Sequence, residues 1–223
     1  MTVDLVIFDC DGVLIDSEII SARMLIDALA SLGVQIDLAY VAQYFLGRSY
    51  PTVMAQIRHD FALDLPASFE DDYRTRLLAA FERDLQVMPG VAAVLQMLTV
   101  PFCVATSSSP RRVEHSLRLT GLWPLVQGRV FTASEVAHGK PAPDLFLHAA
   151  ARMNATPARC LVIEDSLTGI RAAHAAGMEV WRFTGGSHLG PQAAAEPPDA
   201  TPTLRFAKFS DFFHIDPRIT GHP

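Results

Sequence analysis

Five short apolar runs constrain the fold of this chain more than any other feature. They cover residues 5–8, 102–105, 160–163 and 180–183, with a weaker run at 130–131. Each run is continuous rather than alternating, which is typical of parallel strands buried on both faces. Helical patterns separate them, at residues 89–98, 110–119, 143–153 and 166–176. Because strand and helix alternate, we predict an α/β domain with a Rossmann-like parallel sheet and right-handed crossovers.

The segment between the first two runs breaks this alternation. It carries helical patterns at residues 17–32, 38–46, 51–61 and 67–85, and no convincing strand pattern. Four helices in about 70 residues predict a small bundle inserted into the sheet domain. We therefore expect a catalytic core made of residues 1–15 and 88–223, and an inserted four-helix cap made of residues 16–87. The Ala- and Pro-rich tail at residues 191–202 is expected on the surface, before a last short strand near 204–206.

The composition excludes several classes of protein. Hydrophobic residues make up 50% of the 223 residues, enough for a large core, and the net charge is −6 without a basic block, so we expect no nucleic-acid partner. The apolar runs are far shorter than the roughly 18 residues of a membrane span, and the start MTVDLVIF has no signal-peptide pattern. Three widely spaced cysteines form no disulfide framework. We expect a cytoplasmic monomer or weak dimer without a membrane partner.

Polar residues follow the predicted strands, at the edge where open parallel sheets bind ligands. They are Asp9 and Asp11, then Thr106, Ser107 and Ser108, then Lys140 in the loop after the weak run, and finally Glu164 and Asp165. Any one of these groups alone is ordinary, since aspartate and glycine are common in turns. Together they predict a site for Mg²⁺ and phosphate. Carboxylate oxygens suit Mg²⁺, while hydroxyl, amide and ammonium groups can hold phosphoryl oxygens.

These residues resemble the four signature motifs of the haloacid-dehalogenase-like phosphohydrolases. The run Asp9-Cys10-Asp11-Gly12-Val13-Leu14 is similar to the first motif, and Glu164-Asp165-Ser166 resembles the fourth. Thr106 stands where the second motif has its serine or threonine, and Lys140 matches the lysine of the third. The order and spacing are similar across nearly the whole chain, and the inserted helices resemble the type-1 cap of that family.

The resemblance implies a phosphatase that works through a covalent intermediate. Asp9 would attack phosphorus to form an aspartyl phosphate, and Asp11 would protonate the leaving alcohol and then deprotonate the attacking water. Mg²⁺ would be held by the Asp9 side chain, the backbone carbonyl of Asp11 and Asp165, with Glu164 bound directly or through water. Lys140 would offset negative charge on Asp9 and the phosphoryl group.

The cap is expected to select the substrate. Gly47 and Arg48 lie between the second and third predicted cap helices, in a loop that reaches the site in this family. Arg48 would bind a carboxylate or hydroxyls, although a solvated surface arginine is a close alternative. We therefore expect a small phosphorylated metabolite, either a sugar phosphate or a sugar-acid phosphate such as 6-phosphogluconate.

Three other functions agree less well with these residues. A mutase of the β-phosphoglucomutase type carries a histidine in its first cap helix, where this chain has Ser21, and a cap-loop arginine where it has Tyr50. Water is therefore the expected phosphoryl acceptor, with the mutase as the alternative. A haloacid dehalogenase lacks the second aspartate, so Asp11 argues against it. A non-catalytic phosphometabolite-binding regulator is the second alternative, but it has no need of both Asp9 and Asp11.

Overall fold

The core is a six-stranded parallel sheet. The computed structural model describes residues 3–189, 196–215 and 219. The strand order is β3-β2-β1-β4-β5-β6, and every neighbouring pair is parallel. The strands are β1 (Leu5–Phe8), β2 (Phe102–Thr106), β3 (Val130–Thr132), β4 (Cys160–Glu164), β5 (Glu179–Phe183) and β6 (Leu204–Phe206). The predicted Rossmann-like sheet is confirmed, with β1 near its centre.

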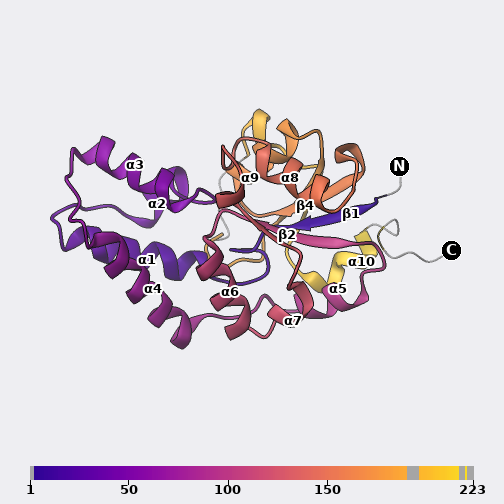
Figure 1. Cartoon of the computed structure of the whole chain (residues 1–223), viewed down its shortest axis with the longest axis horizontal. Coiled ribbons are helices and arrows are strands. Elements are labelled where there is room, and N and C mark those ends of the chain that lie inside the picture. Colours follow the sequence, from indigo (N-terminus) through magenta and orange to yellow (C-terminus); the bar gives the residue numbers. More distant parts are fainter. Residues whose placement is uncertain (1–2, 190–195, 216–218, 220–223) are drawn as a thin grey trace.

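Helices cover both faces of this sheet (Figure 1). On one face an apolar cluster is completed by α5 (Val91–Met97), α6 (Pro110–Leu119), α7 (Trp123–Val126) and α10 (Phe212–Ile215). On the other face a second cluster is completed by α8 (Asp144–Arg152) and α9 (Leu167–Ala175). Short 3-10 helices occur at η1 (Ala133–Glu135), η2 (Pro157–Arg159), η3 (Pro198–Ala200) and η4 (Phe209–Asp211). Because both faces are covered, the strands are continuously apolar.

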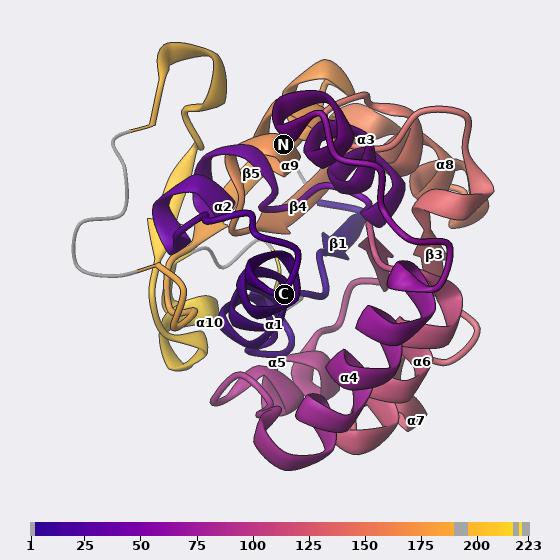
Figure 2. The same ribbon diagram turned by 90° about the vertical axis from the view of Figure 1, so that its left-hand side faces the viewer.

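Four helices between β1 and α5 form the cap, which projects from one end of the sheet domain (Figures 1 and 2). They are α1 (Glu18–Ala30), α2 (Leu38–Tyr44), α3 (Tyr50–Phe61) and α4 (Phe69–Asp84). The cap has its own apolar cluster, in which Leu29, Ile57 and Leu77 are almost fully buried. A separate apolar core of this kind is typical of a distinct folding unit.

The two chain crossings between core and cap lie side by side. The backbone N–H of Asp16 donates to the carbonyl of Gln86 at 2.9 Å, and that of Met88 donates to the carbonyl of Leu14 at 2.9 Å. This pairing supports the predicted division of the chain into two domains. We retain as a proposal a core of residues 1–15 and 88–223 and a cap of residues 16–87.

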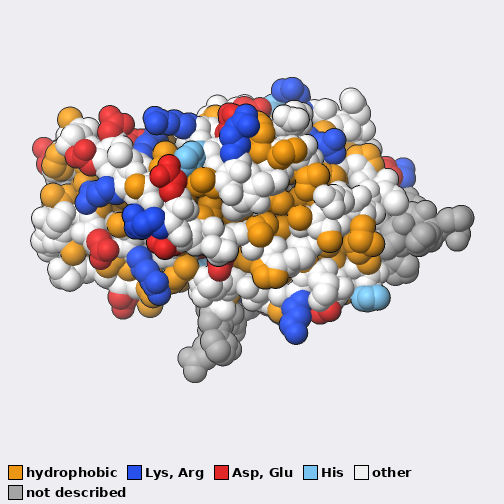
Figure 3. Space-filling view, turned by 90° about the horizontal axis from the view of Figure 1, so that it is seen from below, with side chains coloured by type: hydrophobic (Ala, Val, Ile, Leu, Met, Phe, Trp, Pro, Cys, Tyr) orange, Lys and Arg blue, Asp and Glu red, His pale blue; other side chains and the backbone are white. Residues whose placement is uncertain are grey.

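Figure 3 shows Lys and Arg interspersed with Asp and Glu over the cap end of one face. Within the described ranges, no helix combines the length and apolar composition that crossing a membrane requires. Of the predicted surface tail, residues 191–195 lie outside the described part of the chain, and the last strand is confirmed as β6.

Candidate active site

Three adjacent strands bring the predicted polar residues to one edge of the sheet. Asp9 directly follows β1, while Thr106 and Glu164 are the last residues of β2 and β4, which flank β1. All three are buried, with Thr106 and Glu164 at 0% exposure. The parallel arrangement therefore gathers residues that are up to 155 positions apart, since 164 − 9 = 155. Lys140 reaches the same edge from the loop before α8.

Lys140 contacts residues at the carboxyl ends of β1, β2 and β4. Its Nζ donates hydrogen bonds to Asp9 Oδ1 at 2.7 Å, to Glu164 Oε1 at 2.8 Å and to the carbonyl of Ala105 at 3.1 Å. Burial alone would lower the pKa of Lys140, but the Asp9 and Glu164 carboxylates outweigh burial and hold that pKa above its usual value. Lys140 is therefore a positioned cation rather than a surface lysine.

Asp9, Glu164 and Asp165 form a buried acidic cluster, with one carboxyl oxygen of each lying within 4.8 Å of the others. Burial raises the pKa of Asp9, Lys140 opposes this, and the nearby carboxylates add to it. Burial and Glu164 likewise raise the pKa of Asp165. Asp165 Oδ2 is buried without a hydrogen-bond donor among the described residues. Crowded carboxylates with an unpartnered oxygen fit a divalent cation.

Glu164 already has protein donors on both oxygens. Oε1 accepts from Lys140, and Oε2 accepts from the backbone N–H groups of Asp165 at 3.0 Å and Ser166 at 2.9 Å and from Ser166 Oγ at 2.9 Å. Glu164 thus holds Lys140 and shapes the turn that presents Asp165. This arrangement favours a water-mediated rather than a direct bond from Glu164 to a cation, and the ligand role of Glu164 stays a prediction.

Asp11 is in a different environment from Asp9. Its Oδ1 accepts from Ser17 Oγ at 2.6 Å and Arg112 Nη2 at 2.7 Å, and its Oδ2 accepts from Ser108 Oγ at 2.6 Å. Burial acts to raise the pKa of Asp11, but Arg112 and the serine hydroxyls hold it below its usual value. The two aspartates, which are separated by one residue, therefore have pKa shifts of opposite sign in the absence of a cation and a substrate.

The cap loop packs directly on this edge. Ser107 Oγ donates to the carbonyl of Gly47 at 2.9 Å. Gly47 has φ +73°, and a Cβ there would lie 2.3 Å from Ser166 Oγ. Only glycine allows this approach of cap to core, because another side chain would strain the backbone and meet Ser166. The predicted loop thus reaches the site.

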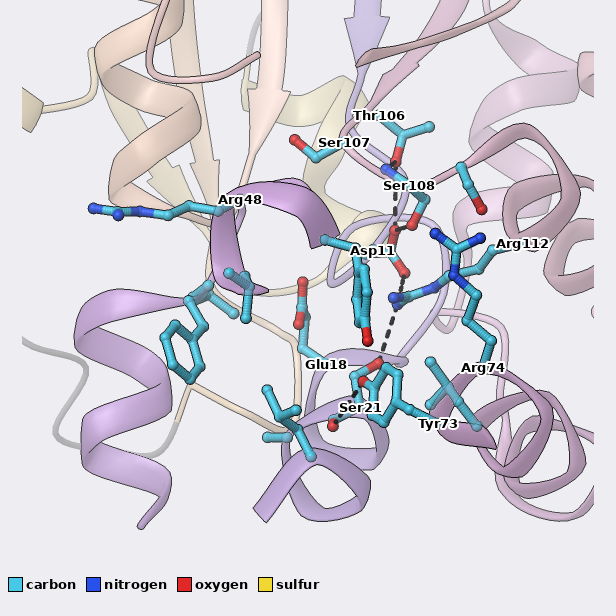
Figure 4. Close-up of a pocket in the computed structure, with 18 of the residues that line it drawn as sticks. Asp11, Glu18, Ser21, Arg48, Tyr73, Arg74, Thr106, Ser107, Ser108 and Arg112 are labelled. Atoms are coloured by element: carbon cyan, nitrogen blue, oxygen red, sulfur yellow. Dashed lines mark hydrogen bonds and ion pairs between the residues drawn. The ribbon is translucent and has the colours of Figure 1, made fainter. Parts of the chain in front are cut away.

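A cavity of about 400 Å³ lies between cap and core. Asp9 and Asp11 line one part of it, and Glu18, Tyr73 and Arg74 of the cap line another (Figure 4). Burial and the charges of Asp11 and Asp165 raise the pKa of Glu18 to about 8. Arg48 also lines the cavity, but its guanidinium points away from Asp11. Its substrate contact, which would require the side chain to turn, stays a prediction.

Several residues at the site were missed in the sequence. Ser17 and Arg112 donate to Asp11, and His188 Nε2 lies 2.8 Å from Asp165 Oδ2 without hydrogen-bond geometry. The sequence did contain a signal for Arg112. This residue lies in the first turn of the predicted helix at 110–119, shortly after Ser107 and Ser108, and the first turn of such a helix lies at the carboxyl end of the preceding strand, where ligands bind. His188 follows β5 in a Gly-Gly-Ser-His loop, which gave no comparable signal.

Comparison with known proteins places these features in a family. The family model of haloacid dehalogenase-like hydrolases matches residues 3–177. A probable pseudouridine-5'-phosphatase of Drosophila melanogaster is 36% identical over 78% of each chain. The 6-phosphogluconate phosphatase of Escherichia coli K12 is 29% identical over 85% of this chain and 86% of that protein. A solved haloacid dehalogenase-like protein of unknown function from Agrobacterium tumefaciens superposes with a TM-score of 0.80, at 36% identity and over 96% and 97% of the two chains.

The two named relatives are phosphatases, which agrees with the expected class of phosphoric monoester hydrolase. The type-1 arrangement of an inserted helical cap over a parallel sheet likewise agrees with the resemblance seen in the four motifs. This chain belongs to the haloacid dehalogenase-like hydrolase family.

Proposed function

We propose that this protein is a Mg²⁺-dependent phosphatase that hydrolyses a small phosphorylated sugar or sugar acid, such as 6-phosphogluconate, through an aspartyl phosphate on Asp9. The observation that carries the proposal is the placement of Asp9. Asp9 Oδ1 accepts a hydrogen bond from Lys140 Nζ at 2.7 Å. The Asp9 side chain belongs to a buried acidic cluster and, together with Asp11, lines the cavity. Such a constellation suits phosphoryl transfer, where charge must be offset around the transferred group.

Asp9 is the proposed nucleophile. Lys140 holds Oδ1, which leaves Oδ2 to attack phosphorus. In the first step the bond from Asp9 to phosphorus forms as the bond to the leaving oxygen breaks, and Asp11, in its protonated form, gives its proton to that oxygen. The negative charge of a bound phosphoryl group beside Asp11 would oppose the effect of Arg112 and favour this protonated form. In the second step water attacks phosphorus, Asp11 takes a proton from the water, and the bond from phosphorus to Asp9 breaks. Both side chains end as they began.

The cation would be held by the side chains of Asp9 and Asp165 and by the backbone carbonyl of Asp11, with Glu164 in support. When bound, Mg²⁺ supplies positive charge that offsets the carboxylates and the phosphoryl oxygens. Asp165 Oδ2 is buried and accepts no hydrogen bond from the described residues, although His188 Nε2 lies 2.8 Å away, and this oxygen is the observation that fits the assignment. Phosphoryl oxygens would be bound by Thr106, the backbone near Ser107 and Ser108, and Lys140, all of which lie at the same edge of the sheet.

The walls of the cavity support an acidic or highly hydroxylated substrate. Besides Asp9 and Asp11, its charged lining residues are Glu18, Arg48, Asp71, Arg74, Arg111 and Arg112. With Asp9 and Asp11 counted, the lining holds four arginines and four carboxylates, and the raised pKa of Glu18, about 8, favours its neutral form at pH 7. Arg112 pairs with Asp11 and Arg74 pairs with Glu70, whereas Arg48 and Arg111 have no ion pair among the described residues. These two arginines favour a second anionic group on the substrate, as in a sugar-acid phosphate. The named activity of the E. coli relative points in the same direction.

Hydrolysis is better supported than phosphoryl transfer between sugar hydroxyls. At the position of the mutase histidine, Ser21 Oγ donates to the carbonyl of Ser17 at 2.9 Å and accepts from Arg112 at 3.0 Å. A serine held in this way does not replace an imidazole base. The complete pair of Asp9 and Asp11 likewise favours an enzyme over a binding protein without catalysis.

A phosphate-release screen over phosphorylated metabolites tests the proposal. We expect release from a sugar phosphate or sugar-acid phosphate in the presence of Mg²⁺ and none in EDTA. Isomerisation of a hexose phosphate with little phosphate released would favour the mutase instead. Binding of several phosphometabolites with no turnover would favour the regulator.

A further inference from the structure

One side chain in the cavity contacts the core and two cap helices at the same time. Arg112 stands in the first turn of α6, and its Nη2 donates to Asp11 Oδ1 at 2.7 Å and to Ser21 Oγ at 3.0 Å. Its guanidinium carbon lies 5.2 Å from the centroid of the Phe81 ring. Ser21 is on α1 and Phe81 is on α4, so two of these three contacts are made to the cap. Figure 4 shows Arg112 between Asp11 and Ser21.

The orientation of the Asp11 carboxyl group depends on both domains. Ser108 holds one oxygen from the core, while Ser17, at the start of the cap, and Arg112 hold the other. Within the described residues, Arg112 is the charged donor of this set. All three hydrogen bonds have an ionised acceptor, and such bonds are about twice as strong as those between neutral groups. Arg112 adds a charge of its own, so it holds the carboxyl group by an ion pair as well as by a hydrogen bond.

We propose that Arg112 is a positioning residue for proton transfer by Asp11, and that it couples this transfer to the placement of the cap. The inference rests on the proposed function, because it assumes that Asp11 gives a proton to the leaving oxygen. The ion pair favours the carboxylate form of Asp11, which is the form left after that transfer and the form that accepts the proton of water in the second step. Ser21 and Phe81 in turn hold the guanidinium, so a displaced cap withdraws two of its supports.

A substrate-binding arginine is the competing role, since Arg112 also lines the cavity. The two roles respond differently to the leaving group. A residue that acts through Asp11 matters most when the leaving oxygen is a poor leaving group and needs a proton. A residue that binds the organic part of the substrate acts equally on substrates of the same shape, whatever their leaving group.

The test compares substituted phenyl phosphates, which share a ring but differ in the acidity of the released phenol. For Arg112→Met we expect kcat/KM to fall by roughly 30-fold or more with phenyl phosphate and by less than about 5-fold with 4-nitrophenyl phosphate. Arg112→Lys, which keeps the charge, should fall between the wild type and Arg112→Met. Should Arg112→Met not fold, as shown by its melting curve, Arg112→Lys carries the same comparison.

Arg118→Met is the matched control. Arg118 is on the same helix, pairs with Glu114 and lies 5.1 Å from the Trp123 ring centroid, and it does not line the cavity. It should leave the dependence on leaving group unchanged. If the Arg112 variants lose the same factor in kcat/KM with every phenyl phosphate, the inference is overturned. The proposed function is not affected by that result, provided that the wild type hydrolyses these substrates. A wild type that hydrolyses none of the phenyl phosphates would overturn the proposed function, and the inference with it.

Discussion

The ammonium group of Lys140 lies 2.7 Å from the carboxylate of Asp9, across 131 residues of sequence. Both side chains are buried, and Glu164 completes the arrangement at 2.8 Å from the same ammonium. A buried charge is tolerated only with a partner, so each member of this group requires the others. The relationship links the stability of the core to the residue proposed to attack phosphorus.

Lys140→Met is therefore expected to lower the free energy of unfolding in EDTA by about 3 kcal/mol, because it leaves two buried carboxylates without their cation. The measurement is urea denaturation. Lys208→Met is the control, since Lys208 is exposed, and its effect should stay within about 0.5 kcal/mol. Equal stability of the two variants would show that Lys140 does not hold the carboxylates together.

Mg²⁺ should stabilise the folded protein through the acidic cluster. At about 100 times its Kd, a ligand that binds only the folded state adds about 2.7 kcal/mol, which corresponds to a rise in Tm of roughly 5–10 °C for a chain of this length. Asp165→Ala should lose most of this rise. Asp84→Asn, which removes an exposed carboxylate at the end of α4, should retain it. A full Mg²⁺ response in Asp165→Ala would exclude Asp165 as a ligand.

Gly47→Ala tests the approach of the cap loop to the core. Gly47 and Gly33 both have positive φ, at +73° and +82°, but a Cβ at Gly33 meets no atom within 4 Å. Both alanine variants should lose about 1–2 kcal/mol of stability from backbone strain. Only Gly47→Ala should also lower kcat/KM, by roughly 10- to 100-fold, because it displaces the loop from Ser166. Similar kcat/KM values for the two variants would argue against a closed cap during turnover.

A buried ion pair beside the site predicts a pH-dependent contribution to stability. Arg182 Nε donates to the backbone carbonyl of Asp165 at 2.9 Å, and Arg182 Nη1 donates to Glu196 at 2.8 Å. Hydrogen bonds from Arg205 and Arg182 lower the pKa of Glu196 in the folded protein below 4.5. Because the folded pKa is depressed, the ion pair stabilises the fold above about pH 4.5, and this contribution is lost as the pH falls through the folded pKa.

Glu196→Gln should thus cost about 1–3 kcal/mol at pH 7 and progressively less in acid. The measurement is the free energy of unfolding as a function of pH. Asp199→Asn is the comparison, because Asp199 is 65% exposed in its pair with Arg171 and should contribute little. If the loss of unfolding free energy caused by Glu196→Gln does not change with pH, the ion pair is not the source of that loss.

Much of the fold could be predicted because buried parallel strands and amphipathic helices leave local patterns. The weak run at 130–131 became β3, and the predicted helix at 17–32 became α1, which ends at Ala30 before the turn to Gly33. The four-residue helix α7 was missed, because a single turn carries no periodicity.

The site was predictable where chemistry follows directly after a strand, as it does for Asp9 and Asp165. It was not predictable where a contact depends on the placement of the cap. Arg112 meets Ser21 and Phe81 only after the two domains have packed, and no spacing in the sequence records that contact. The two occupied oxygens of Glu164 likewise depend on a turn and a loop that only the fold brings together.

The central claim is that Asp9 is the nucleophile of a phosphatase, and the most direct measurement is phosphate release from 4-nitrophenyl phosphate by the wild type and by Asp9→Asn. Both proteins are assayed with Mg²⁺, after melting curves have shown that both are folded. We predict steady release by the wild type and a loss of at least about 10³-fold in kcat for Asp9→Asn, because the amide is not a nucleophile. Turnover by Asp9→Asn close to that of the wild type would contradict the account.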